Sequence, residues 1–256
     1  MILRVWTLAS NTLREAIRSK LLYTLLGFAI AMILFAIALS QLSYIDNDRI
    51  LQDFGFASIR LFSVAIAIFV GVNLIHKEVD RRTVYTILSK PLSRSEFLIG
   101  KYVGLLMTIW LQLGIMVVFF IGTSLLTGAP LDSSHAAVVA LLAVELALVV
   151  AIATLFSSFT TPMLASFFSV GVWIVGNLTR DLKLMGEKAT GSSIGWVTTW
   201  LHRLLPDMAS FDLTLESAHG LPISASDLVI PTIYGVGYIA ILLVISMIIF
   251  ERRDFR

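Results

Sequence analysis

The chain has 256 residues, of which 57% are hydrophobic and 14% are charged, with no cysteine and a net charge of +2. Soluble domains are about 45–50% apolar and about 25% charged, so this chain has few charged side chains to cover a water-facing surface. The composition excludes a disordered chain, a disulfide scaffold and a cysteine-ligated zinc module, and it argues against a soluble enzyme. An integral membrane protein is the remaining class.

Residues 1–20 are expected to form an amphipathic helix that precedes the first membrane span. Apolar residues recur at helical spacing at Ile2, Trp6, Ala9, Leu13 and Ile17. The basic residues Arg4, Arg14 and Arg18 fall mostly on the other face. Such a helix suits the headgroup layer of a membrane. The sequence leaves open whether it only fixes the topology or also docks a partner.

Six apolar segments are long enough to cross a bilayer as helices, which takes about 20 residues. They cover about residues 21–42, 54–75, 102–127, 136–157, 159–179 and 228–250. Because they lack the alternating pattern of membrane strands, we expect an all-α fold with six transmembrane helices. A cleaved signal peptide is the alternative for the first segment, but its apolar run exceeds the usual length of about 7–15 residues.

The distribution of basic residues predicts the orientation in the membrane. Of the 19 lysines and arginines, 13 lie in the N-terminal segment, in the loop after the second span and at the C-terminus. Loops rich in Lys and Arg stay in the cytoplasm. Both termini and this loop are therefore expected on the cytoplasmic side.

The loop of residues 76–101 is expected to carry ordered structure. Val84, Ile87 and Leu88 form a short apolar face at helical spacing. Lys90-Pro91 ends this pattern, because proline disfavours helix in the residue before it. Ser93 with Glu96 three residues later predicts a capping box at the start of the third membrane helix. We expect two short helices around the proline, projecting into the cytoplasm.

Three polar residues inside predicted spans are candidates for a role beyond packing: Arg60, Gln112 and Glu145. Glu145 falls near the middle of the fourth span, where a charge costs about 2.5–3.5 kcal/mol on insertion scales. Gln112 is expected at a similar depth and Arg60 somewhat nearer the outside, so either could be its partner. Two interpretations stay open: a structural hydrogen bond between helices, or a role in transport or gating.

The outer loop of residues 180–227 is expected to contain a short amphipathic or re-entrant helix, since apolar residues repeat at helical spacing between Ile194 and Leu204. Gly191-Ser192-Ser193-Ile194-Gly195 has the spacing of a nucleophile motif, but nothing around it predicts the required strand–turn–helix. The four histidines show no metal-ligand spacing, so no metal site is expected. Ala143, Ala147 and Ala151 form a stripe of small residues suited to close helix packing.

Two motifs resemble the permeases of ATP-binding-cassette (ABC) transporters of the type-2 exporter class. One is the run Glu78…Arg82-Thr83…Leu88-Ser89-Lys90-Pro91…Ser93-Arg94…Glu96-Phe97…Gly100-Lys101, and the other is the ending Phe250-Glu251-Arg252-Arg253-Asp254-Phe255. They are most similar to the permease components of multicopper-enzyme maturation systems, of the nitrous-oxide-reductase accessory type. Arg82 departs from the glycine that many of those members have before the threonine.

The resemblance implies a single permease domain over residues 1–256 in the cytoplasmic (inner) membrane of a prokaryote. This chain would not itself be an enzyme, because Gly100-Lys101 lacks the earlier glycine of a phosphate-binding loop. ATP and Mg would be bound by a partner dimer of cytoplasmic ABC ATPase subunits, and no cofactor by this chain. A second permease copy or homologue would complete the complex, and no nucleic-acid partner is expected.

The resemblance also implies which residues couple ATP hydrolysis to the spans. They lie in or beside the cytoplasmic loop: Glu78, Arg82, Thr83, Leu88, Lys90, Pro91, Ser93, Arg94 and Glu96. The implied function is export of an unidentified substrate across the membrane. The alternative is an envelope anchor that transmits ATPase motion mechanically to an extracytoplasmic accessory protein, with the acidic outer loop as its platform.

Overall fold

The computed structural model describes residues 2–40, 47–80, 93–129, 132–179, 181, 184, 205–218 and 221–252. Every regular element in these ranges is helical. The elements are α1 (Ile2–Ile17), α2 (Lys20–Ser40), α3 (Asn47–Asp80), α5 (Arg94–Thr127), α6 (Ser133–Phe159), α7 (Pro162–Asn177), the 3-10 helix η1 (Met208–Phe211), α10 (Thr214–Ala218) and α11 (Ala225–Arg252). The all-helical expectation is confirmed for the described chain.

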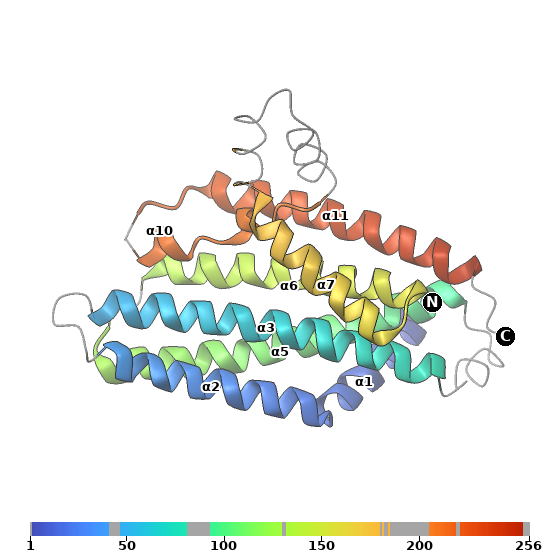
Figure 1. Ribbon diagram of the computed structural model, residues 1–256, viewed down its shortest axis with the longest axis horizontal. Helices are drawn as coiled ribbons and strands as arrows, with labels where there is room; N and C mark the ends of the chain where they lie inside the picture. Colours follow the sequence, from blue (N-terminus) through green and yellow to red (C-terminus); the bar gives the residue numbers. More distant parts are fainter. Residues whose placement is uncertain are drawn as a thin grey trace.

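Five of these helices, α2, α3, α5, α6 and α11, are long and apolar enough to cross a membrane. The remaining predicted span corresponds to α7, which is apolar but has only 16 residues. The long helices run side by side along one axis (Figure 1). The start of α1 and the end of α11 lie at the same end of this bundle, which we call the termini end (Figure 1).

Helices α3 and α5 both extend beyond the predicted spans. The α3 helix continues to Asp80, and α5 begins at Arg94 after the N-cap Ser93. The Ser93 hydroxyl accepts a hydrogen bond from the Glu96 amide at 3.2 Å, and the Glu96 carboxylate accepts one from the Ser93 amide at 3.1 Å. This is the predicted capping box. Because hydropathy marks only the apolar part of a helix, the sequence pattern places the polar ends of both helices in the loop of residues 76–101.

Helix α6 is the centre of the bundle and contacts α3, α5, α7 and α11. Its predicted small-residue stripe lets aromatic side chains of α5 reach its backbone. Trp110 Nε1 donates a hydrogen bond to the Ala143 carbonyl, and the Tyr102 hydroxyl donates one to the Ala147 carbonyl, both at 3.1 Å. The Ala143 and Ala147 positions therefore allow the close approach expected of them.

Helix α1 packs against α5 through small residues on both helices. A Cβ at Gly104 would lie 2.6 Å from Thr12 Cβ, and one at Gly100 would lie 2.8 Å from Leu8 Cβ. The contact face of α1 buries Ala9, Thr12 and Ala16, whereas Trp6 is 57% exposed. The face of α1 that packs on the bundle is therefore not the apolar stripe read from the sequence, although Ala9 belongs to both.

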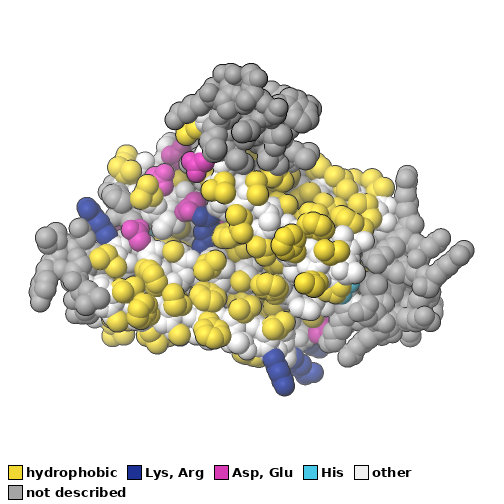
Figure 2. Space-filling view, viewed as in Figure 1, with side chains coloured by type: hydrophobic (Ala, Val, Ile, Leu, Met, Phe, Trp, Pro, Cys, Tyr) yellow, Lys and Arg dark blue, Asp and Glu magenta, His cyan; other side chains and the backbone are white. Residues whose placement is uncertain are grey.

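Large apolar side chains cover much of the outer surface. Figure 2 shows them spread over the visible face of the bundle, with few charged side chains among them. The least buried of the long helices are α2 and α11, which expose residues such as Phe28, Phe35 and Ile233. Such a surface is suited to lipid rather than to water.

Candidate functional site

The strongest polar site in the described structure is an ion pair between α3 and α6. Arg60 Nε donates a hydrogen bond to Glu145 Oε2, and Arg60 Nη2 donates one to Glu145 Oε1, both at 2.9 Å. The Glu145 side chain is fully buried and that of Arg60 is 16% exposed. This parallel two-bond geometry is the strong form of an arginine–carboxylate contact. Arg60 is therefore the partner of Glu145, which is one of the two alternatives that the sequence allows.

Helix α7 adds two polar side chains to this pair. Trp173 Nε1 donates a hydrogen bond to Glu145 Oε1 at 2.9 Å. Asn177 Oδ1 accepts one from Arg60 Nη2 at 2.8 Å, and Asn177 Nδ2 donates to the Trp173 carbonyl at 2.8 Å. Trp173 and Asn177 are four residues apart, so they lie on one face of α7. The short helix α7 thus contributes hydrogen-bond donors and an acceptor to the ion pair between Arg60 of α3 and Glu145 of α6.

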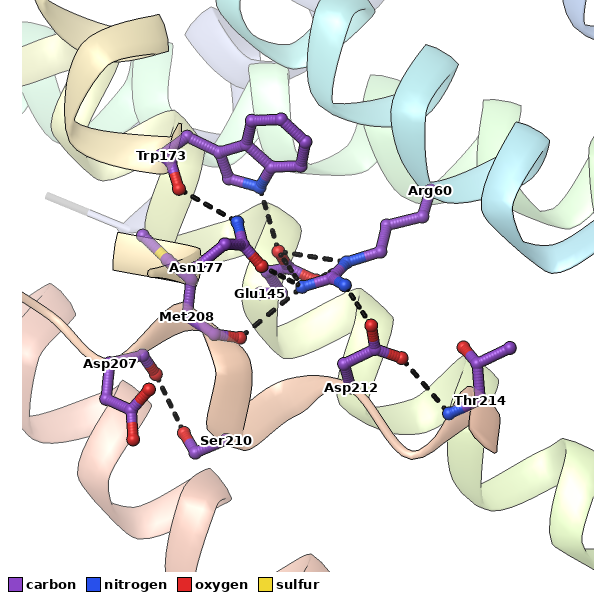
Figure 3. Close-up of polar contacts among 9 residues, drawn as sticks. All are labelled: Arg60, Glu145, Trp173, Asn177, Asp207, Met208, Ser210, Asp212 and Thr214. Atoms are coloured by element: carbon purple, nitrogen blue, oxygen red, sulfur yellow. Dashed lines mark hydrogen bonds and ion pairs between the residues drawn. The ribbon is translucent and has the colours of Figure 1, made fainter. Parts of the chain in front are cut away.

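The segment of residues 205–218, which contains η1 and α10, closes the cluster from another side. Arg60 Nη1 forms an ion pair with Asp212, and Arg60 Nη2 donates to the Met208 carbonyl at 3.4 Å. The other oxygen of Asp212 accepts a hydrogen bond from the Thr214 amide at 3.0 Å, at the start of α10. Figure 3 shows the guanidinium of Arg60 between these groups. One side chain therefore joins α3, α6, α7 and the 205–218 segment.

Glycines position the 205–218 segment against the bundle. A Cβ at Gly176 of α7 would lie 2.6 Å from Met208 Cγ, and one at Gly235 of α11 would lie 3.0 Å from the Phe211 ring. Met208 and Phe211 are almost fully buried as a result. The Thr179 hydroxyl also donates a hydrogen bond to Asp207 at 2.7 Å, and the Asp207 amide donates to the Tyr234 hydroxyl at 3.1 Å. The segment is packed into the bundle rather than lying over it.

The cluster contains one cation and two carboxylates. A charge buried away from water is tolerated only when it is paired and hydrogen-bonded, so Arg60 and Glu145 stabilise each other at this depth. Asp212 is 35% exposed. A cavity of about 240 Å³ lies beside it, lined by Ala57, Arg60, Leu61, Trp173, Asn177, Asp212 and Thr214. These contacts hold the 205–218 segment against the bundle. If the contact between Arg60 and Asp212 breaks, Glu145 is still paired with Arg60.

A family model described as "ABC-2 family transporter protein" matches residues 6–255. The match spans nearly the whole chain. This protein belongs to the ABC-2 transporter family. Members form the transmembrane subunit of an ABC transporter and work with an ABC ATPase, so this ABC-2 chain is a multi-pass membrane protein and not itself the ATPase. The search of curated proteins finds no match.

Gln112 of the ABC-2 chain lies apart from the Arg60 cluster. Its Nε2 donates hydrogen bonds to Ser63 Oγ at 3.2 Å and to Met116 Sδ at 2.7 Å. Its Oε1 is buried with no hydrogen-bond partner among the described residues. Gln112 therefore links α5 to α3, and it is not a partner of Glu145.

The predicted coupling residues fall partly outside the described structure. The residues outside the described ranges are Arg82, Thr83, Leu88, Lys90 and Pro91. The predicted helix between Ile194 and Leu204 also lies outside them. Glu78 belongs to the last turn of α3, and Ser93 and Glu96 form the cap of α5.

Arg94 has contacts within the chain that a coupling role alone does not predict. It donates hydrogen bonds to the Phe250 carbonyl at 3.4 Å and the Glu251 carbonyl at 2.9 Å. Next to it, the rings of Phe97 and Phe250 stack with centroids 6.0 Å apart. The two motifs that carry the family resemblance, after the second span and at the C-terminus, thus meet at the termini end.

Several residues of the cluster are not identified by sequence reasoning. Trp173 and Asn177 sit in or at the end of an apolar run, and Asp212 is one of several acidic residues of the outer loop. One signal could have found the 205–218 segment: apolar Met208, Phe211 and Leu213 are interspersed with Asp207 and Asp212 in the stretch that follows Pro206. Such a mixture favours a buried segment with paired carboxylates over a solvated loop.

Proposed function

We propose that this ABC-2 chain is the permease subunit of an ATP-driven exporter in which the Arg60 cluster is a latch. The observation that carries the proposal is that one guanidinium joins α3, α6, α7 and the 205–218 segment. The latch would hold the segment in place in the resting state. Rearrangement of α3, driven by the ATPase, would release Asp212 and open a path on that side of the membrane.

The basic residues at the termini end support the proposed orientation. Helix α1, which carries Arg14 and Arg18, and the start of α5, which carries Lys101, lie toward this end (Figure 1). This end would therefore be cytoplasmic and the 205–218 segment extracytoplasmic, in the inner membrane. In this arrangement α7 would be the fifth of six crossings, short because the 205–218 segment fills the bundle beside its end. Helix α1 would lie as an amphipathic helix in the cytoplasmic headgroup layer.

The proposed complex has two permease chains and two ATPase subunits, and ATP and Mg would be bound by the ATPases. The coupling surface would be the connection between α3 and α5: Glu78, Arg82, Thr83, Leu88, Lys90, Pro91, Ser93, Arg94 and Glu96. Its position supports this, because α3 carries Arg60 and runs directly into the connection. Movement of this connection by the ATPase would be transmitted along α3 to Arg60. The subtype associated with multicopper-enzyme maturation is the branch we propose.

A disulfide lock tests whether the segment must move. Ser134 Oγ of α6 and Ser217 Oγ of α10 are 2.9 Å apart, and the chain has no cysteine of its own. In the complex with its ATPase in vesicles, Ser134→Cys/Ser217→Cys should form a disulfide on oxidation. We expect permease-dependent ATP hydrolysis to fall about tenfold or more, equivalent to about 1.4 kcal/mol, and to recover with a reductant.

The two single variants are the matched controls and should respond to neither oxidant nor reductant. Mass spectrometry of the oxidised double variant shows whether the disulfide has formed. Full activity with the disulfide formed would overturn the latch. Coupled ATP hydrolysis without any transported molecule would count against export.

A further inference from the structure

A polar hollow of about 590 Å³ lies between the second half of α1 and the second half of α3. It is separate from the Arg60 cluster and shares no residue with it. Its lining comes from the second half of α1 and from α3: Asn11, Arg14, Glu15, Arg18, Ser19, Val70, Asn73 and Leu74. The family assignment gives this hollow no role.

Two guanidinium groups face the hollow from one side. Asn11, Arg14 and Arg18 recur at spacings of three and four residues, which places them on one face of α1. Arg14 and Arg18 are exposed, and within the described ranges neither guanidinium has an ion pair or a side-chain hydrogen bond. Arginine forks are suited to phosphate oxygens, which accept two parallel hydrogen bonds.

The acidic residue of the hollow is already compensated. Glu15 Oε2 lies 3.8 Å from the Nζ atom of Lys101, whose side chain is only 3% exposed. A buried ammonium next to this carboxylate offsets its charge. The hollow therefore keeps the positive charge of Arg14 and Arg18, and a negative ligand would enter without repulsion.

The surroundings of the hollow favour a lipid. Val70 and Leu74 give it an apolar side, and exposed Leu21 and Tyr23 follow Ser19 at the start of α2. Figure 2 shows basic side chains gathered at the edge of the visible face where α1 joins α2, next to the apolar surface. Arginines beside an apolar surface match a phospholipid, because its headgroup phosphate binds arginine and its acyl chains pack on apolar side chains.

We propose that this hollow binds the phosphate of an anionic phospholipid headgroup, held by Arg14 and Arg18. Asn11 and Asn73 supply further hydrogen-bonding groups at its walls. The bound lipid fastens the α1–α3 corner to the membrane surface. This site is independent of the latch, and failure of one proposal leaves the other standing.

Native mass spectrometry of the full chain tests the site. The protein in detergent is offered phosphatidylglycerol or phosphatidylcholine, and we expect phosphatidylglycerol to be retained preferentially. Arg14→Gln/Arg18→Gln should lower that retention about tenfold or more, because each charge-assisted contact is strong. Arg49→Gln, at the opposite end of the bundle, removes a positive charge and should leave retention unchanged.

Three results would overturn the proposal. They are equal retention of both lipids by the unmodified chain, unchanged phosphatidylglycerol retention in the double variant, and binding of inorganic phosphate without any preference for phosphatidylglycerol. The last result would assign the hollow to free phosphate. If the double variant does not fold, Arg18→Gln and Arg18→Lys replace it: the lysine keeps the charge without the fork and should retain more lipid than the glutamine.

Discussion

Arg60 connects four parts of the described structure through one side chain. Its guanidinium contacts Glu145, Asn177, Asp212 and the Met208 carbonyl at once. An unpaired charge at this depth would be costly, and the pair with fully buried Glu145 removes most of that cost. Arg60, Glu145, Asn177 and Asp212 are therefore one coupled unit, and removing one of them changes the environment of the others.

Single and double substitutions should be strongly non-additive in this unit. Arg60→Met leaves Glu145 buried without a cation, and we expect it to destabilise the fold by about 3–5 kcal/mol, typical of a broken buried pair. Arg60→Met/Glu145→Gln removes both charges and should recover most of that loss. The measurement is thermal unfolding in detergent, followed by tryptophan fluorescence.

Gln112→Leu is the control for this cycle, since it removes a buried polar group outside the cluster. Its Oε1 has no partner among the described residues, and Ser63 Oγ keeps its own hydrogen bond to Met116 Sδ when the Gln112 amide is removed, so the substitution should cost little. Additive losses in the double variant would contradict the coupled unit.

Two helices approach closely only where both carry small side chains, and one face of α5 shows this. Gly100 and Gly104 admit α1, whereas a Cβ added at Gly114 or Gly122 of the same helix would meet no neighbouring atom within 4 Å. The start of α5 also carries Arg94 and Phe97, which contact the end of α11. Helix α5 therefore ties α1 and α11 together at the termini end.

Two glycine substitutions on α5 should separate packing from lipid exposure. Gly104→Leu would place atoms inside the α1 contact, and we expect a loss of about 1–3 kcal/mol, typical of overpacking, with α1 displaced. Gly114→Leu adds the same side chain at an open position and should be neutral or stabilising, since leucine is a better helix former. Thermal unfolding and the rate of proteolysis within α1 measure the two effects. Equal losses at both positions would show that the α1 contact is not close.

The described part of the molecule is an apolar bundle in which α1, with Arg14 and Arg18, lies toward the termini end (Figure 1). The segment that carries Asp207 and Asp212 packs toward the opposite half of the bundle (Figure 1). A membrane whose cytoplasmic face lies at the termini end places the basic residues of α1 next to that face. The latch and the lipid hollow would then lie near opposite surfaces of the membrane.

Cysteine labelling in sealed vesicles tests this orientation, because the chain has no native cysteine. Thr7 of α1 and Ser226 in the first turn of α11 are both exposed. These two helices begin in opposite halves of the bundle (Figure 1). With the cytoplasmic face inside, Thr7→Cys should react with an impermeant maleimide only after lysis. Ser226→Cys should react at once. The reverse pattern would show that the orientation is the opposite of the one proposed. Labelling of both cysteines before lysis would contradict the placement of Thr7 and Ser226 on opposite sides of the membrane.

The sequence by itself determined the class of the fold and some local structure. Length and hydropathy located the long helices, because backbone groups in lipid must be satisfied within a helix. The Ser93–Glu96 capping box was predicted because such a cap depends only on residues three apart. Arg60, Gln112 and Glu145 stood out because polar groups are rare inside spans.

The tertiary structure decided which of these residues meet. Arg60 and not Gln112 pairs with Glu145, and the 205–218 segment brings Asp212 to the same guanidinium. Likewise α1 docks through Ala9, Thr12 and Ala16 rather than through its apolar stripe. The physical reason is that apolar side chains are stable both against lipid and in the bundle core, so hydrophobic periodicity does not show which face is packed. Contact then depends on helix rotation and depth, which are set by close packing at small residues such as Gly104 and Gly176.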